Sequence, residues 1–127
     1  MKDFKSLTYY GDVYMSLLLA GYQFKGPEPL VDFKETDIDN GIFGIFFLKN
    51  PEKQKANYGV LYLSNVEEIK AAKGFPENHK KYAEWAQEAK SPANLYIGFC
   101  PTPGLVPQKR DLIIKHLIYR YNPACNK

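Results

Sequence analysis

The sequence contains few of the residues on which metal and redox sites depend: two cysteines, two histidines, two methionines and one tryptophan in 127 residues. Cys100 and Cys125 have no cysteine or histidine at zinc-ligand spacing, and His79 and His116 lie 37 residues apart. The Gly-x-Gly-x-x-Gly, Gly-Lys-Ser/Thr and Gly-x-Ser-x-Gly patterns of dinucleotide sites, phosphate loops and nucleophile elbows are also missing. We therefore expect no metal and no cofactor, and find no support for these site types.

Long hydrophobic runs are absent as well. The longest apolar stretch near the start, residues 15–20, is far shorter than the roughly 20 residues that span a bilayer. Residues 1–5, Met-Lys-Asp-Phe-Lys, lead into neither the apolar segment nor the cleavage site of a secretory signal. These features predict a cytoplasmic protein without membrane association, in which both cysteines are free thiols. A disulfide between the two cysteines is the alternative.

Acidic residues are scarce near the end of the chain, and positive charge gathers there. Residues 105–127 contain five basic residues and one acid, a net charge of +4, whereas residues 1–104 contain 12 basic and 13 acidic residues, a net charge of −1. The basic residues are Lys109, Arg110, Lys115, Arg120 and Lys127, and the acid is Asp111. Such a cluster attracts a polyanion, because neutralised phosphates release counterions. A solvated helix face that only keeps the protein soluble is the other interpretation.

The first 37 residues form a separate predicted unit. Apolar side chains from residue 13 to residue 20 are dense enough for a short buried helix, which Gly21 would end. Residues 25–30, Lys-Gly-Pro-Glu-Pro-Leu, contain two prolines and a glycine, which predicts an irregular connection. We therefore expect an N-terminal helix and loop, residues 1–37, to pack on a core domain of residues 38–127.

Three segments of the core region are predicted as β-strands. They are rich in β-branched and aromatic residues and cover residues 41–48, 58–63 and 94–100. The polar residues between the first two favour an antiparallel hairpin with a long loop. Helices are predicted at residues 66–70, at residues 78–89, and from about Pro107 to a stop at Pro123. The predicted fold class is α+β, with a small three-stranded antiparallel sheet flanked by helices and an N-terminal helical extension.

The last predicted helix has two faces. Its apolar stripe consists of Ile113, Leu117 and Tyr121, flanked by Ile114 and Ile118. The basic residues Arg110, Lys115 and Arg120 fall outside this stripe. The pattern predicts that the stripe packs on the sheet and that the basic residues face solvent.

The order of these segments, together with the closing motif Arg-x6-Leu-Ile-x2-Tyr-x-Pro-x2-Asn at residues 110–126, resembles the GIY-YIG nuclease domain over residues 38–126. The resemblance implies a small antiparallel sheet with paired tyrosines on its first two strands. It also implies an arginine and a histidine or tyrosine on the following helix, and a metal-binding glutamate on a later helix.

Several of these positions carry other residues here. Tyr62 matches the second tyrosine, whereas Phe43 stands where the first would be. Lys73 is the nearest basic residue to the position of the helix arginine, and His79 and Tyr82 lie slightly beyond the histidine or tyrosine position. Tyr62, His79 and Tyr82 are therefore candidate remnants of a catalytic site.

The position of the metal-binding glutamate departs furthest from the family pattern. Ile114 stands there, and an isoleucine supplies no oxygen ligand for Mg²⁺. Asp111, one turn earlier, is the only carboxylate of the helix and could replace the ligand only after a shift of register. A literal Tyr-Ile-Gly at residues 96–98 falls at the third strand and is interpreted as a coincidence. Magnesium is expected only if catalysis is retained.

The sequence thus predicts a nucleic-acid-binding domain without nuclease activity. The residues expected to contact DNA or RNA are Lys73, Lys109, Arg110, Lys115 and Arg120. One alternative is a protein-interaction or inhibitor module whose basic helix binds an acidic protein partner. Another is a metal-dependent endonuclease with a rearranged site, which requires Asp111, Glu67 or Glu68 to approach Tyr62.

Overall fold

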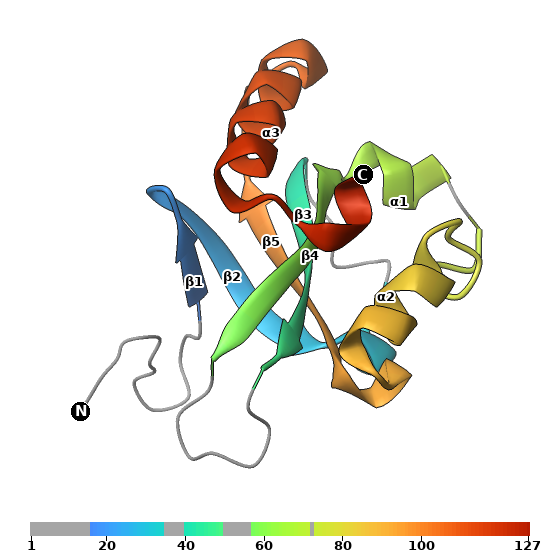
Figure 1. Cartoon of the computed structure of the whole chain (residues 1–127). Helices are drawn as coiled ribbons and strands as arrows, with labels where there is room; N and C mark the ends of the chain where they lie inside the picture. Colours follow the sequence, from blue (N-terminus) through green and yellow to red (C-terminus); the bar gives the residue numbers. More distant parts are fainter. Residues whose placement is uncertain (1–15, 35–39, 50–56, 72) are drawn as a thin grey trace.

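The computed structural model describes residues 16–34, 40–49, 57–71 and 73–127 (Figure 1). Its strands are β1 (Ser16–Leu19), β2 (Tyr22–Pro29), β3 (Gly41–Leu48), β4 (Tyr58–Asn65) and β5 (Leu95–Pro101). Its helices are α1 (Glu67–Ala71), α2 (Tyr82–Ala89) and α3 (Pro107–Tyr121), with short 3-10 helices at Leu30–Asp32, Pro92–Asn94 and Ala124–Asn126. The α+β class and the order of elements predicted from residue 41 onward are confirmed.

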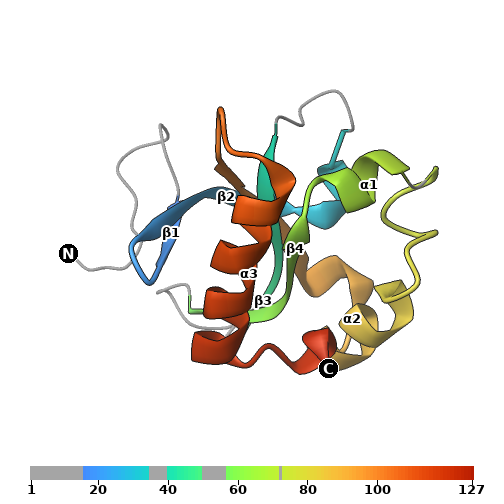
Figure 2. The same cartoon turned by 90° about the horizontal axis from the view of Figure 1, so that it is seen from above.

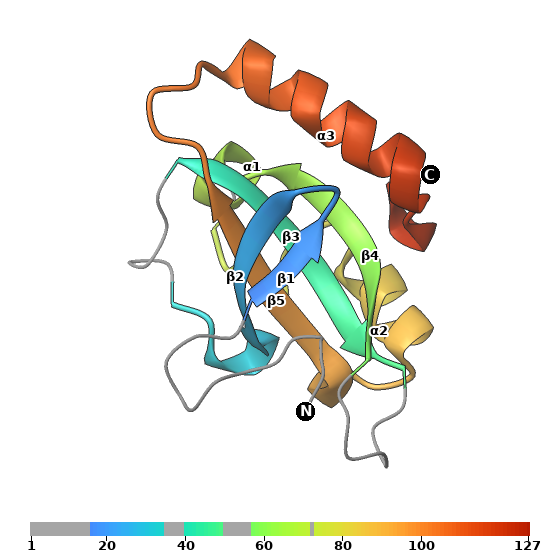
Figure 3. The same cartoon turned by 90° about the vertical axis from the view of Figure 1, so that its left-hand side faces the viewer.

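The five strands form one curled antiparallel sheet in the order β1-β2-β5-β3-β4 (Figure 3). Strands β3, β4 and β5 correspond to the three predicted strands, and β3 lies between the other two. The prediction of a three-stranded sheet is nevertheless wrong, because β1 and β2 extend the sheet beyond β5. The sheet therefore includes residues that the sequence assigned to a separate N-terminal unit.

The predicted N-terminal helix is wrong where the structure describes it. Residues 16–19 form β1, and Leu19 pairs directly with Tyr22 at the start of β2. Ala20 and Gly21 between them have φ values of 51° and 90°, as in the two-residue turns that join twisted antiparallel strands. Gly21 therefore completes a hairpin turn and does not end a helix. Residues 13–15 of the predicted helix lie outside the described residues.

The predicted irregular connection at residues 25–30 is also mostly strand. Strand β2 continues through it to Pro29, and its register against β5 shifts between Lys25 and Glu28. Gly26 and Pro27 lie within this bulge and have no partner in the register with β5, and pairing resumes at Glu28. A bulge thus accommodates residues that would interrupt a regular strand.

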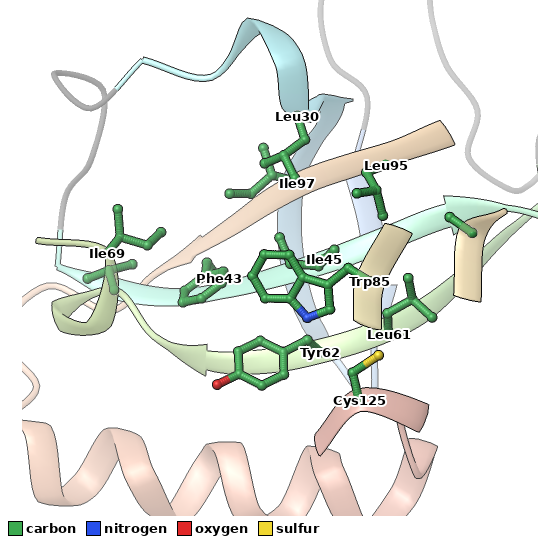
Figure 4. Close-up of a cluster of buried hydrophobic side chains, with 12 residues drawn as sticks. Leu30, Phe43, Ile45, Leu61, Tyr62, Ile69, Trp85, Leu95, Ile97 and Cys125 are labelled. Atoms are coloured by element: carbon green, nitrogen blue, oxygen red, sulfur yellow. The ribbon is translucent and has the colours of Figure 1, made fainter. Parts of the chain in front are cut away.

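Helices cover the two faces of the sheet separately (Figure 2). On the face of α1 and α2, Trp85 packs against Phe43, Ile45 and Tyr62, as Figure 4 shows. On the other face, α3 and the β1–β2 hairpin enclose a second cluster that includes Leu117. Alternate side chains of β3 enter the two clusters, so β3 is the shared centre of the core.

Helix boundaries agree with the sequence at α3 and differ at α2. Helix α3 begins at Pro107, as predicted. Helix α2 begins at Tyr82, several residues after the predicted start, because consecutive turns precede it. In these turns the backbone N–H groups of Asn78 and His79 donate to the carbonyl oxygens of Gly74 and Pro76. This irregular segment determines where His79 lies.

Candidate functional site

The inner face of α3 includes a charged residue. Arg110, Ile114 and Leu117 are buried and lie at the spacing that puts residues on one side of a helix. Arg110 was predicted to face solvent. This prediction is wrong, because only 2% of the residue is exposed. Tyr121, predicted to belong to the packed stripe, is 36% exposed. Arg110 is therefore not available to a nucleic acid that approaches from outside.

Arg110 connects the start of α3 to the junction between β4 and α1. Its Nη1 donates to Asn65 Oδ1 at 2.6 Å and to Glu67 Oε1 at 3.0 Å, and its Nη2 donates to the Leu105 carbonyl oxygen at 3.0 Å. Asn65 also accepts a hydrogen bond from the Glu67 backbone N–H, at 3.2 Å, and so caps α1. The arginine has a structural role in this arrangement.

Other residues of the closing motif also attach α3 to the sheet. The Tyr121 hydroxyl oxygen accepts a hydrogen bond of 2.7 Å from the Ala20 backbone N–H in the β1–β2 turn. Asn126 Oδ1 accepts from the Leu63 N–H at 2.9 Å, and Asn126 Nδ2 donates to the Leu63 carbonyl oxygen at 3.0 Å. The Asn126 amide thus satisfies both backbone groups of one residue on β4. The motif that carries the family resemblance serves packing here.

The solvent side of α3 combines positive charge with large apolar side chains. We call it the outer face of α3, and its exposed residues are Gln108, Lys109, Leu112, Lys115, His116, Tyr119 and Arg120, with Asp111 exposed at its edge beside Lys115. Leu112 is 63% exposed and Tyr119 is 88% exposed. No described element covers this face in Figures 1 and 3. It is therefore a candidate interface.

The cations of the outer face surround its aromatic ring. At 100° per residue, Tyr119 points between Lys115 on one flank and His116, Lys109 and Arg120 on the other. Within the described part of the chain, Lys109, Lys115 and Arg120 form no ion pair. Lys73, the remaining predicted contact, is exposed in the turn after α1 and does not belong to α3.

A second polar group lies on the other side of β4 around one carboxylate. We call it the Glu68 cluster, and it consists of Tyr62, Ser64, Glu68 and His79. Glu68 Oε1 accepts from the Tyr62 hydroxyl at 2.8 Å and contacts His79 Nε2 at 2.6 Å, while Oε2 accepts from the Ser64 hydroxyl at 3.0 Å. Two of the predicted remnants, Tyr62 and His79, therefore meet through a shared acceptor.

The orientation of His79 is fixed from both sides. The Lys81 backbone N–H donates to His79 Nδ1 at 3.0 Å, which leaves the ring proton on Nε2, facing Glu68. The indole of Trp85 stacks on the imidazole with ring centroids 4.7 Å apart. Tyr82 is the third predicted remnant, and its ring lies edge to face with that of Trp85, with ring centroids 6.4 Å apart. Its side chain forms no hydrogen bond with the Glu68 cluster.

Tyr62 is held as a neutral hydrogen-bond donor. Burial, and then the hydrogen bond to Glu68, raise the pKa of the Tyr62 phenol far above its ordinary value of 10.0, and the nearby Ser64 hydroxyl offsets only part of this rise. A phenol with a raised pKa keeps its proton at neutral pH, so it is poorly suited to act as a general base. Figure 4 shows the Tyr62 ring under Trp85 with its hydroxyl at the margin of the buried cluster.

The residues present do not fit a magnesium ion. Ile114, at the position of the family glutamate, is 8% exposed and packs in the same apolar cluster as Leu63 and Leu117. Both oxygens of Glu68 already accept hydrogen bonds from protein donors. In the described ranges, no three or more His, Cys, Asp or Glu side chains gather as metal ligands would.

Sequence reasoning identified Tyr62 and His79 but not the way in which they are joined. Glu68 was named as a carboxylate that could approach Tyr62, and it does so. Ser64, whose hydroxyl donates to Glu68, was not among the predicted site residues. The spacing Ser64-x3-Glu68, across the start of a helix, was the available signal.

Comparisons with protein-family models, with curated proteins and with solved structures give no match. None of the described helices is both long enough and apolar enough to cross a membrane. Cys100 and Cys125 are both free, as predicted, and both are buried. The outer face of α3 and the Glu68 cluster are therefore the candidate sites among the described residues.

Proposed function

We propose that the protein binds DNA or RNA through the outer face of α3 and does not cleave it. The observation that carries the proposal is the presence of three exposed cations, Lys109, Lys115 and Arg120, on one face of a helix whose other face is packed. Because none of the three forms an ion pair with another described residue, phosphates need not displace an existing partner. Asp111 is also exposed and lies one turn before Lys115, so the three cations stand beside a single acid of α3.

Three features of the chain support binding without cleavage. Ile114 is packed in an apolar cluster. The carboxylate of Glu68 already accepts hydrogen bonds from protein side chains, and Tyr62 retains its proton. Hydrolysis of a phosphodiester needs a polarised phosphate and an activated nucleophile. We infer that the resemblance of residues 38–126 to the GIY-YIG nuclease domain reflects a related scaffold without the catalytic groups.

The test is the salt dependence of binding to a labelled oligonucleotide, measured by fluorescence anisotropy. For each phosphate contact removed, the slope of log affinity against log salt should fall by about 0.7 to 0.9. Lys115→Ala and Arg120→Ala should each weaken binding and reduce this slope. The matched control is Lys80→Ala, which removes an exposed lysine next to α2, the helix on the opposite face of the sheet. Unchanged slopes in both α3 variants would refute the proposal.

An acidic protein partner is the second candidate, favoured by the exposed apolar side chains Leu112 and Val106 beside the cations. Val106 is 52% exposed, and a protein interface buries such groups whereas a phosphate backbone does not. In this case Leu112→Ala should weaken binding of the partner, and excess DNA or RNA should not displace it. Competition by nucleic acid would favour the first proposal.

Retained cleavage is the third candidate, favoured by the 2.8 Å contact between Glu68 and Tyr62. Labelled single-stranded, double-stranded and branched DNA, incubated with magnesium or manganese, provide the test. Our proposal expects every substrate to remain intact. Cleavage by the wild-type protein that disappears in Tyr62→Phe would contradict it and would identify an enzyme with a rearranged site.

A further inference from the structure

Tyr119 has no structural role that the described residues reveal. Among the large hydrophobic side chains of the described residues it is the most exposed, at 88%, while Tyr22, Tyr58 and Tyr96 are half-buried. Its hydroxyl forms no hydrogen bond with the rest of the described chain, in contrast to Tyr121, which holds the β1–β2 turn. An aromatic ring left in water at this position points to a ligand that covers it.

The neighbours of Tyr119 define the chemistry of that ligand. Lys115 lies one turn before the ring, and Arg120 lies on its other flank. A planar ring between cations is complementary to a nucleotide, because the base can stack on the ring while its phosphates meet the ammonium and guanidinium groups. The same arrangement is poorly suited to a duplex, in which neighbouring base pairs already cover the faces of each base.

We propose that the outer face of α3 binds single-stranded nucleic acid and that Tyr119 is its base-stacking platform. The inference rests on the proposed function, since it specifies which nucleic acid the cationic face accepts. Stacking does not depend on base identity, so binding should be tolerant of sequence. The ring belongs to a helix fixed to the sheet through Arg110 and Tyr121, which keeps the platform rigid.

Fluorescence anisotropy with oligothymidine, oligouridine and a mixed-sequence DNA duplex, each of about 12 nucleotides per strand, tests this inference. Wild-type protein should bind the single strands more tightly than the duplex. Tyr119→Ala should weaken single-strand binding roughly 5- to 150-fold and leave duplex binding unchanged, while Tyr119→Phe should bind like the wild type. The oligothymidine and oligouridine measurements distinguish DNA from RNA as the better ligand.

The outcomes separate this inference from the proposed function. If Tyr119→Ala binds single strands like the wild type while Lys115→Ala reduces the salt slope of binding, the stacking platform is refuted and the cationic interface stands. Preference of the wild type for the duplex would also refute it. If no oligonucleotide binds at all, the proposed function itself fails. Because Tyr119 is exposed, we expect its variants to fold, which circular dichroism can verify.

Discussion

The replacement of Arg110 by alanine separates a structural arginine from a phosphate contact. The side chain is 2% exposed, and three acceptors on β4, on α1 and before α3 take its hydrogen bonds. Removal of one partner from a buried ion pair costs about 3–5 kcal/mol when the remaining charge stays buried. Here the remaining Glu67 side chain is 48% exposed and can be hydrated, so we expect a loss near the lower limit, about 3 kcal/mol.

A loss of that size should be easy to measure. For a domain of this length it corresponds to a fall in Tm of about 10 °C, measured by thermal unfolding with circular dichroism. Arg110→Lys should recover only part of the loss, because one ammonium cannot reproduce the fork of the guanidinium. The control is Lys109→Ala, which removes the neighbouring exposed cation and should change stability by less than about 0.5 kcal/mol.

The salt dependence of binding completes this test. At temperatures where Arg110→Ala remains folded, its slope should equal that of the wild type, whereas Lys109→Ala should reduce it. If Arg110→Ala were as stable as the wild type and its binding showed a reduced salt slope, the structural role would be refuted. Arg110 would then be a phosphate contact.

Three further predictions concern side chains that form buried or partly buried contacts. Asn126→Ala removes both hydrogen bonds to Leu63 and should lower the unfolding free energy in urea by about 1–3 kcal/mol; an unchanged midpoint would contradict this. Glu68→Gln removes a charge that raises the pKa of Tyr62, so an ultraviolet titration should show this phenol ionising at lower pH than in the wild type. Burial, followed by nearby acids, raises the pKa of Cys125 from 9.0 to about 11. The folded state thus favours the protonated thiol, so its contribution to the unfolding free energy is complete below pH 9 and is lost as pH rises through about 11. Between these pH values the unfolding free energy of Cys125→Ala should fall less steeply than that of the wild type. Parallel plots of unfolding free energy against pH for the two proteins would refute this.

Much of the sheet was predictable because its central strands obey local rules. The runs at residues 41–48, 58–63 and 94–100 are dense in β-branched and aromatic side chains, and both faces of β3 are buried. The β1–β2 hairpin was missed because a glycine after an apolar run ends a helix and also completes a two-residue turn. Only the pairing of β2 with β5 distinguishes the two, and that contact is distant in sequence.

The candidate site was predictable only in part. Arg110 was expected to be exposed because it is charged. Its spacing from Ile114 and Leu117, however, puts it on the buried side of the helix. Tyr62 was found through the family resemblance, but its neutral state depends on burial and on Glu68, which no local pattern specifies. The family resemblance itself, and the nucleic-acid partner, remain predictions.

Backbone amide chemical shifts, measured while a single-stranded oligonucleotide is added, would show which face of the protein binds nucleic acid. We expect the largest changes on the outer face of α3, at Lys115, Tyr119 and Arg120, and small changes around Lys80 beside α2. Saturating shifts confined to the α2 side of the sheet, or no shifts at low salt, would contradict the assignment of α3 as the nucleic-acid interface.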